Sequence, residues 1–279
     1  MNQCVYFLLS SAYVQCTPIR CMICATSPYY ASSIQSSRIP VSRDFIQPRV
    51  QYRYLYLCNM PSGRKFELNE AEIAKSKKLN HVPHNEHYDK MISAMGYHEY
   101  EPQLVQARHN IHVTQKKYND YFPEDITPEQ LRNDRAVMLE NMVGHVGKNP
   151  HIEAPVYFDY GCNFSCGQDF VASYNCVFLD CALITIGDRV VMGPGVKLIT
   201  ATHDVEVQTR RDGIEYASPI TIGDDCWLGS AVQVMPGVTI GKGCTISAGS
   251  VVTRDIPPFS VAVGAPAKVT RTLKNPDSS

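Results

Sequence analysis

The sequence predicts a mainly β protein, a parallel β-solenoid preceded by a small helical region. The first observation is a period of six: between Ile220 and Val252 an aliphatic residue occupies every sixth position. These anchors are Ile222, Leu228, Val234, Ile240, Ile246 and Val252. An α-helix repeats about every 3.6 residues and a strand every second one, so neither produces this period. A six-residue unit supplies one short strand and one turn, and it buries its apolar face only when units stack.

The second observation is the kind of residue found between the anchors. Small or β-branched side chains stand four positions after an anchor, and glycine directly follows three anchors. The former are Cys226, Val232, Val238, Cys244 and Ser250, and the glycines are Gly223, Gly229 and Gly241. The same period starts earlier, with Phe158, Phe164, Phe170 and Cys176, and resumes after a phase shift with Ile186, Met192 and Leu198. Three six-residue sides make a coil of about 18 residues, whose parallel strands bond to the coils above and below.

The third observation is the segment before Pro155, which carries helical signals. Helices are expected over 67–78, over 87–96, from Pro102 to about Tyr118, and after Thr127. Thr127 is a capping residue, followed by a proline at the first helical position and acidic residues in the first turn. The predicted organisation is an extension at 1–65, a helical domain at 66–150, a solenoid with a C-terminal cap at 151–273, and a tail at 274–279.

Composition limits the function. The chain has 279 residues and a net charge of −1, which points to no polyanion-binding role, and no apolar run approaches the ~20 residues of a membrane helix. We therefore expect no nucleic-acid or membrane partner. Residues 1–65 hold seven basic residues and one acidic residue. A cytoplasmic location is predicted, although an organellar transit peptide, an unstructured extension or a true start at Met60 all fit this segment. The 11 cysteines lack the spacings of structural zinc sites, and we interpret them as reduced apolar fillers.

The candidate chemistry lies where the repeat lapses, between Thr200 and Pro219. Of the nine histidines, only His151 and His203 lie at or beyond the start of the solenoid, and only His203 is in this polar segment. Glu215 shares the segment and could orient the imidazole. A histidine whose tautomer is fixed by a carboxylate is the usual general base for deprotonating an alcohol.

Two further features suit a flat, phosphate-bearing ligand. Trp227, the single tryptophan, follows an interior position and should face outward, either as a ligand wall or as a packing surface for another subunit. Thr253, Arg254, Lys268 and Arg271 lie close together near the end of the solenoid. Such a charge cluster is either a solvated face or one end of a phosphate site.

These residues occur in motifs that resemble the maltose/galactoside/nodulation O-acetyltransferase group of hexapeptide-repeat proteins. The motifs are YNCVFLD (174–180), ITIGD (184–188), MGPGV (192–196), ATHD (201–204), GIEY (213–216), PITIGDDCWLGS (219–230), PGVTIG (236–241), AGSVVTRDIPP (248–258) and VGAPAKV (263–269). The resemblance extends from about Tyr88 to Leu273. It implies a left-handed parallel β-helix, a homotrimer with active sites between subunits, acetyl-CoA as donor and a sugar hydroxyl as acceptor. It implies no metal.

The resemblance also assigns roles to single residues. His203 matches the catalytic base, and Glu215 stands where some relatives have a carboxylate and others methionine. The acceptor-binding positions are Asn175, Asp180, Arg108 and Glu99. The cofactor-binding positions are Trp227, Ser230, Ala248, Thr253, Arg254, Lys268 and Arg271. Relatives often carry arginine where Lys268 stands, which implies a weaker bidentate phosphate contact here.

Three alternatives share this fold. A serine or xenobiotic O-acetyltransferase differs in its acceptor. A γ-type carbonic anhydrase needs three metal-binding histidines, whereas the interrupted segment of this solenoid offers His203 alone. A non-catalytic scaffold subunit typically lacks the loop histidine. The presence of His203 in its ATHD context therefore favours an enzyme.

Overall fold

The structure, a computed structural model, describes residues 65–276. The expectations for the N-terminal extension therefore lie, except at Lys65, outside the described residues. Within 65–276 none of the helices has the length and apolar character needed to cross a bilayer. The described residues belong to one compact unit, and the division into domains at 66–150 and 151–273 stays a prediction.

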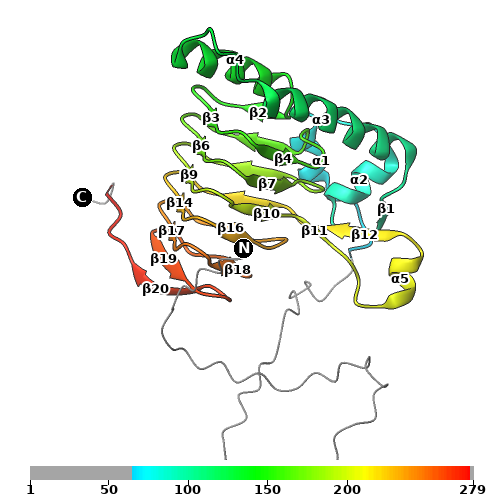
Figure 1. Cartoon of the computed structure of the whole chain (residues 1–279). Helices are drawn as coiled ribbons and strands as arrows, with labels where there is room; N and C mark the ends of the chain where they lie inside the picture. The colour runs from blue at the N-terminus through cyan, green and yellow to red at the C-terminus, as the bar shows by residue number, and fades with distance from the viewer. Residues whose placement is uncertain (1–64, 277–279) are drawn as a thin grey trace, which may run out of the picture. The chain divides into compact units, whose positions relative to one another are not determined.

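Three sheets, parallel except for their last strand β20 (Lys268–Thr272), form the sides of a solenoid, which confirms the predicted parallel β-solenoid (Figure 1). One side consists of β2 (His145–Val146), β5 (Phe164–Cys166), β8 (Ile184–Ile186), β13 (Ile220–Ile222) and β16 (Thr239–Ile240). The second consists of β4 (Val156–Phe158), β7 (Cys176–Leu179), β10 (Lys197–Ile199), β15 (Gln233–Val234) and β18 (Val251–Val252). The third consists of β3 (His151–Ile152), β6 (Val171–Ala172), β9 (Val191–Met192), β14 (Trp227–Leu228), β17 (Thr245–Ile246), β19 (Ser260–Val263) and β20 (Lys268–Thr272).

The strand register explains the period of six. Leu228 pairs with Met192 in the coil before it and with Ile246 in the coil after it, and all three side chains are buried. Anchors of successive coils therefore stack into interior columns that form one continuous hydrophobic core. Cys226 and Cys244 lie inside this core as free thiols, as interpreted from the sequence. The last strand, β20, runs antiparallel to β19 and covers its edge.

Helices occupy most of the segment before the solenoid. They are α1 (Glu70–Ser76), α2 (Glu86–Ile92), α3 (Pro102–Asp120) and α4 (Pro128–Glu140). The Thr127 side chain accepts from the backbone of Gln130, whose side chain accepts from the backbone of Thr127, so the predicted cap is a complete capping box. Both α3 and α4 lie across the first coil (Figure 1), and Ile111, Tyr118 and Leu139 join the solenoid core.

One helix prediction is wrong at its C-terminal end. The helix expected over 87–96 ends at Ile92, and Ala94 has a left-handed φ of 58°. The chain then forms a two-residue strand, β1 (Tyr97–His98). Strand β1 pairs antiparallel with residues of the interrupted segment more than a hundred positions away. Because local propensity carries no information about such a partner, tertiary pairing overrides the helical signal.

Candidate active site

The interrupted segment folds into a small sheet outside the solenoid. Strands β11 (Ala201–Thr202) and β12 (Ile214–Ala217) pair antiparallel, and β1 adds to the other edge of β12. A short helix, α5 (Val207–Arg211), connects β11 to β12. In Figure 1 these elements project from the side of the solenoid opposite to β9, β14 and β17. The helical region and the excursion at 200–217 thus meet through one small sheet.

His203 and Glu215 face each other in this excursion. The Nε2 atom of His203 is 3.7 Å from Oε1 of Glu215, which is longer than a hydrogen bond and within the distance of an ion pair when the imidazole carries a proton. The His203 side chain is 48% exposed, whereas Glu215 is buried. The other carboxylate oxygen, Oε2, accepts a hydrogen bond of 2.5 Å from the hydroxyl of Tyr97. The imidazole is therefore the accessible group, and the carboxylate lies behind it.

The environment of Glu215 acts on its ionisation in both directions. Burial raises the pKa of the Glu215 carboxyl, and the nearby carboxylates of Glu99 and Asp159 add to this effect. The hydrogen bond from Tyr97 and the imidazole of His203 lower the same pKa. A carboxylate held between opposing influences responds strongly to the loss of a single neighbour.

Arg108 lies in the same region and is anchored from two sides. One guanidinium nitrogen donates to the hydroxyl of Tyr160, and another donates to the backbone carbonyl of Glu99 at 2.6 Å. The structure thus connects Arg108 and Glu99, the two predicted acceptor-binding residues of the helical region. Their roles toward an acceptor stay predictions.

Asp180 has a different environment from the other predicted acceptor-binding residues. Its side chain is fully buried, and Oδ1 accepts from the backbone N–H groups of Asp159 and Tyr160 at 3.0 and 2.8 Å. Oδ2 has no hydrogen-bond partner in the structure. Burial raises the pKa of Asp180 to about 8, and the nearby Asp159 adds to this shift. In the isolated chain Asp180 supports the turn after β4, and its contact with an acceptor stays a prediction.

The remaining predicted acceptor-binding residue, Asn175, lies on a different edge. It is exposed at a turn, with a left-handed φ of 62°. Turns of successive coils stack here: the N–H of Gly195 donates to Tyr174, that of Ala231 to Pro194, and that of Gly249 to Ser230. These turns form a corner column that also contains the predicted cofactor-binding residues Ser230 and Ala248.

The corner column and His203 lie at opposite ends of the β10 side of the solenoid. Asn175 precedes β7, whereas His203 follows the C-terminal end of β10, and these two strands are parallel. From the turn at Gly195 to His203 the chain advances eight residues, which separates the two positions by about 26 Å at the rise of extended chain. One copy of the chain therefore does not bring His203 and Asn175 together.

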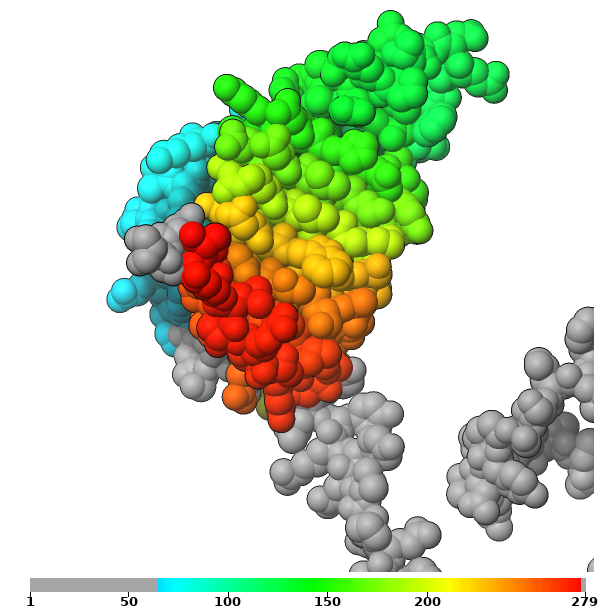
Figure 2. Space-filling view, turned by 90° about the vertical axis from the view of Figure 1, so that its left-hand side faces the viewer, coloured from blue at the N-terminus to red at the C-terminus, as the bar shows by residue number. Residues whose placement is uncertain are grey.

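Three of the seven predicted cofactor-binding residues lie on the side of the solenoid that leads into the corner column: Trp227, Lys268 and Arg271. Trp227 is 56% exposed and aligns across paired strands with Thr245, Val261 and Arg271. Lys268 pairs with Val263 at the other end of β19. Figure 2 views this face, where the C-terminal segment crosses the last coils.

Thr253 and Arg254 follow β18 and lie one strand beyond the corner column. A tight approach of coils shapes the column, because a Cβ on Gly229 would be 2.6 Å from the Ala248 nitrogen.

Sequence reasoning missed Tyr97, Tyr160 and Asp159. Tyr97 fell at the end of an expected helix, and its partner Glu215 is 118 positions away. Asp159 and Tyr160 follow β4 in a stretch that reads as ordinary repeat. The acid directly after a buried strand was the available signal for Asp159, since polar groups at strand ends often line a site.

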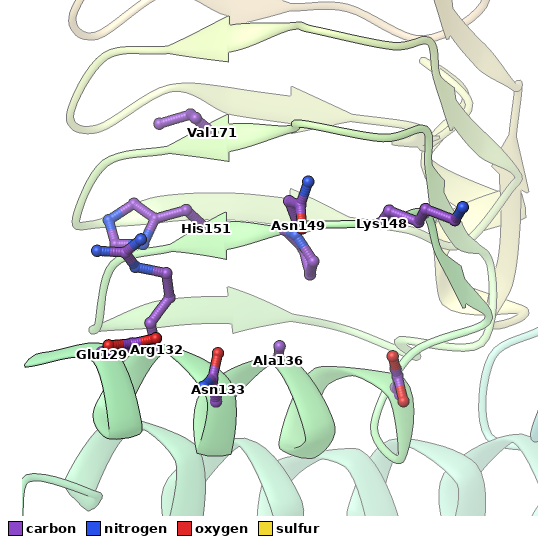
Figure 3. Close-up of a pocket in the computed structure, with 11 residues that line it drawn as sticks. Glu129, Arg132, Asn133, Ala136, Lys148, Asn149, His151 and Val171 are labelled. Carbon is purple, nitrogen blue, oxygen red and sulfur yellow. The ribbon is translucent and has the colours of Figure 1, made fainter.

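One cavity of the described region is separate from His203, which is not among its lining residues. It measures about 610 Å³ and lies between α4 and the first coil (Figure 3). The side chains of Arg132 and His151 point toward each other across it, and Glu129 and Lys148 also line it. Residues 65–276 contain no group of three or more side chains suited to hold a metal ion.

The geometry defines a solenoid with an exposed histidine beside it, and comparisons with known proteins identify the class. Residues 219–254 match the family model for bacterial transferase hexapeptide (six repeats), and residues 90–147 match that for the maltose acetyltransferase hexapeptide capping motif. A protein of Schizosaccharomyces pombe is 47% identical over 206 residues, covering 73% of this chain and 100% of the relative. The chain therefore belongs to the hexapeptide-repeat acetyltransferase family.

Two solved structures agree with this assignment. A maltose O-acetyltransferase from Clostridium difficile is 39% identical, with a TM-score of 0.64 over 68% of this chain and 98% of that one. A galactoside acetyltransferase in complex with coenzyme A is 34% identical, with a TM-score of 0.64 over 70% of this chain and 94% of that one. The chain is thus an acetyltransferase close to the galactoside and maltose O-acetyltransferases.

Proposed function

We propose that the chain transfers an acetyl group from acetyl-CoA to a hydroxyl of a sugar, with His203 as general base. The observation that carries this proposal is the exposed imidazole of His203 in front of the buried carboxylate of Glu215. An exposed histidine beside a carboxylate that stabilises the imidazolium accepts a proton from an alcohol and contributes roughly 10²- to 10⁴-fold to the rate. Relatives solved as maltose O-acetyltransferase and as a coenzyme A complex support the acceptor and donor classes.

The chemistry requires one proton to move twice. As the acceptor oxygen attacks the thioester carbonyl, its proton passes to His203. A proton on Nε2, facing Glu215, leaves the Nδ1 lone pair to accept it, and Glu215 stabilises the imidazolium that forms. The tetrahedral intermediate then collapses with cleavage of the carbon–sulfur bond, and His203 returns the proton to the leaving thiolate. The products are an acetyl ester and free coenzyme A, and the base is regenerated.

The donor is proposed to bind along the face of β14, β17 and β19. The exposed indole of Trp227 offers an apolar wall, and Arg271 lies in the same outward row of side chains. Lys268 adds a second positive charge on β20. A cofactor with an apolar arm and phosphate groups matches this combination, because phosphate oxygens pair well with guanidinium and ammonium groups.

The complete site is proposed to form between two copies of the chain. His203 and the corner column that carries Asn175, Ser230 and Ala248 are on opposite edges of one copy, about 26 Å apart by strand rise. A second copy related by rotational symmetry can place its column beside the His203 of the first. A homotrimer with three shared sites meets this requirement, because cyclic symmetry repeats one contact without open ends.

The test of the function is thiol release from acetyl-CoA by the purified full chain. Glucosides, galactosides, maltose, serine and chloramphenicol serve as acceptors, and His203→Ala is assayed in parallel. Release that depends on a sugar and disappears in the variant supports the proposal. If the chain prefers serine or chloramphenicol, the acceptor is an amino acid or a xenobiotic and not a sugar. If it binds acetyl-CoA but releases no thiol with any acceptor, the assignment of a sugar acceptor is contradicted.

Subunit sharing is tested by mixing two inactive variants. His203→Ala removes the base, and Asn175→Gly removes a column side chain while tolerating the left-handed φ at that turn. Random exchange of equal amounts should restore activity to about a quarter of the wild-type level, because that fraction of sites combines two intact halves. Absence of recovery after verified subunit exchange would place the whole site within one copy.

A further inference from the structure

The helical region donates a hydrogen bond to the proposed catalytic pair from a buried side chain, Tyr97. Its ring is 1% exposed, and its hydroxyl donates to Oε2 of Glu215 at 2.5 Å. Tyr97 and Glu215 are also direct partners in the antiparallel pairing of β1 and β12. Oε1 of the same carboxylate faces His203 at 3.7 Å. One carboxylate thus connects the strand of the helical region with the proposed base.

We propose that Tyr97 is a positioning residue, which holds the Glu215 carboxylate in the orientation that faces His203. The inference rests on the proposed function of His203 as general base. At 3.7 Å the imidazole is too far away to fix the carboxylate by a hydrogen bond, whereas the short hydrogen bond from Tyr97 does fix it. The excursion provides little rigidity of its own, because α5 has no buried residue and no side-chain cap.

The hydroxyl of Tyr97 is suited to this role because it remains a donor. Burial raises the pKa of Tyr97 far above its ordinary value, so the hydroxyl keeps its proton across the pH range of an assay. The groups that face Glu215 from the neighbouring elements are Tyr97 and Glu99 at β1, Asp159 after β4, Cys181 after β7 and His203 after β11. Of these groups, the carboxyl groups of Glu99 and Asp159 oppose ionisation of Glu215, and the imidazole of His203 favours it.

The sign of the effect follows from these contacts. Since the Tyr97 hydrogen bond lowers the pKa of Glu215, its removal raises that pKa further and increases the proton affinity of the Glu215–His203 pair. The active form of the pair needs an ionised carboxylate and a neutral imidazole. The acid limb of the pH profile of kcat/KM should therefore move to higher pH in Tyr97→Phe.

The experiment compares Tyr97→Phe with Tyr118→Phe in the full chain. Tyr118 is equally buried, and its hydroxyl donates to the backbone carbonyl of Ile152 at 2.5 Å, away from the excursion. Two quantities are measured: the titration of the Glu215 carboxyl carbon by ¹³C NMR, assigned with Glu215→Gln, and the pH profile of acetyl transfer. We expect Tyr97→Phe to raise the titration midpoint of Glu215 and to lower kcat about ten- to hundredfold, with an unchanged KM for acetyl-CoA.

A double variant separates positioning from a general loss of structure. In a Glu215→Gln background, Tyr97→Phe should cause little further loss of kcat, because the carboxylate on which the hydroxyl acts is absent. An unchanged Glu215 titration in Tyr97→Phe, additive losses in the double variant, or the same pH shift in Tyr118→Phe would each overturn the proposal. If the wild-type chain acetylates no acceptor, the proposed function fails, and the Glu215 titration still decides whether Tyr97 controls this carboxylate.

Discussion

The solenoid coils and the excursion at 200–217 use short strands of similar length but are stabilised differently. Inside the solenoid each anchor touches its equivalents in the coils before and after, so Leu228 lies between Met192 and Ile246. The excursion has no such repetition. Its helix α5 buries no side chain, and Val207 is 52% exposed. The pairing of β12 with β11 and β1, together with buried hydrogen bonds at Thr200 and Glu215, holds it instead.

This difference separates stability from chemistry. The repeated apolar columns supply the free energy that keeps the scaffold rigid, because many equivalent contacts add along the stack. The irregular excursion places a titratable pair at the surface, where a regular coil would offer only turn residues. Function in rigid scaffolds usually lies on such loops. Substitutions in the excursion should therefore change catalysis and leave the stability of the solenoid intact, and conservative substitutions in the coils should do the reverse.

The largest expected effect is on catalysis by His203→Ala. We expect acetyl transfer to fall by roughly 10²- to 10⁴-fold, since a positioned base contributes about this much. The imidazole is half exposed and outside both apolar clusters, so the melting temperature and the affinity for acetyl-CoA should stay near wild type. Steady-state kinetics, calorimetry and thermal melting measure these three quantities. Weak acetyl-CoA binding in this variant would instead give His203 a structural role.

The same contrast explains what the sequence predicts. The period of six alone identifies the solenoid and its interior positions, because stacking couples each residue to neighbours of the same type. The cap at Thr127 is equally local, and the structure confirms it as a capping box. In contrast, β1 depends on a partner 118 positions away at Glu215, and no local pattern encodes that pairing.

Only part of the candidate site can be predicted from the sequence. His203 and Glu215 are recognisable because they interrupt a regular repeat, and the structure places them 3.7 Å apart. The contact of Tyr97 with the site cannot be predicted from the sequence, because a tyrosine in a helical region is most simply interpreted as a core residue. The burial of Asp180 was equally unpredictable, since an acid at the end of a strand is usually solvated. Their environments come from tertiary packing and not from residue type.

The second expected effect concerns the stability of the scaffold. Leu228→Ala removes a fully buried side chain between two coils, and we expect the free energy of unfolding to fall by about 2–5 kcal/mol. Val207→Ala in the exposed α5 helix is the matched control, and it should change stability by less than about 0.5 kcal/mol. Urea denaturation followed by circular dichroism measures both. An equal loss of unfolding free energy in the two variants would contradict the view that the coils, and not the excursion, stabilise the fold.

A smaller effect is expected from the buried carboxyl of Asp180. Since burial raises its folded-state pKa to about 8, the native state binds the proton more tightly than the unfolded state. The stabilising contribution is present at low pH and is lost as the pH rises from the unfolded value, near 4, towards 8. Asp180→Asn should abolish this loss, because the amide oxygen can still accept from Asp159 and Tyr160. Melting temperatures at pH 5 and pH 8 provide the measurement, and parallel pH dependence in both proteins would contradict it.

The smallest expected effect is on the cap of α4. Thr127→Ala removes the side-chain acceptor of the capping box and should cost about 1 kcal/mol, which lowers the melting temperature by about 2–4 °C in a chain of this size. Thr127→Ser keeps the hydroxyl and is the matched control. Acetyl transfer should not change in either variant, because β1, and not α4, carries the contact between the helical region and Glu215. If Thr127→Ala slowed transfer without lowering the melting temperature, coupling between the helical region and the site would run through α4 instead.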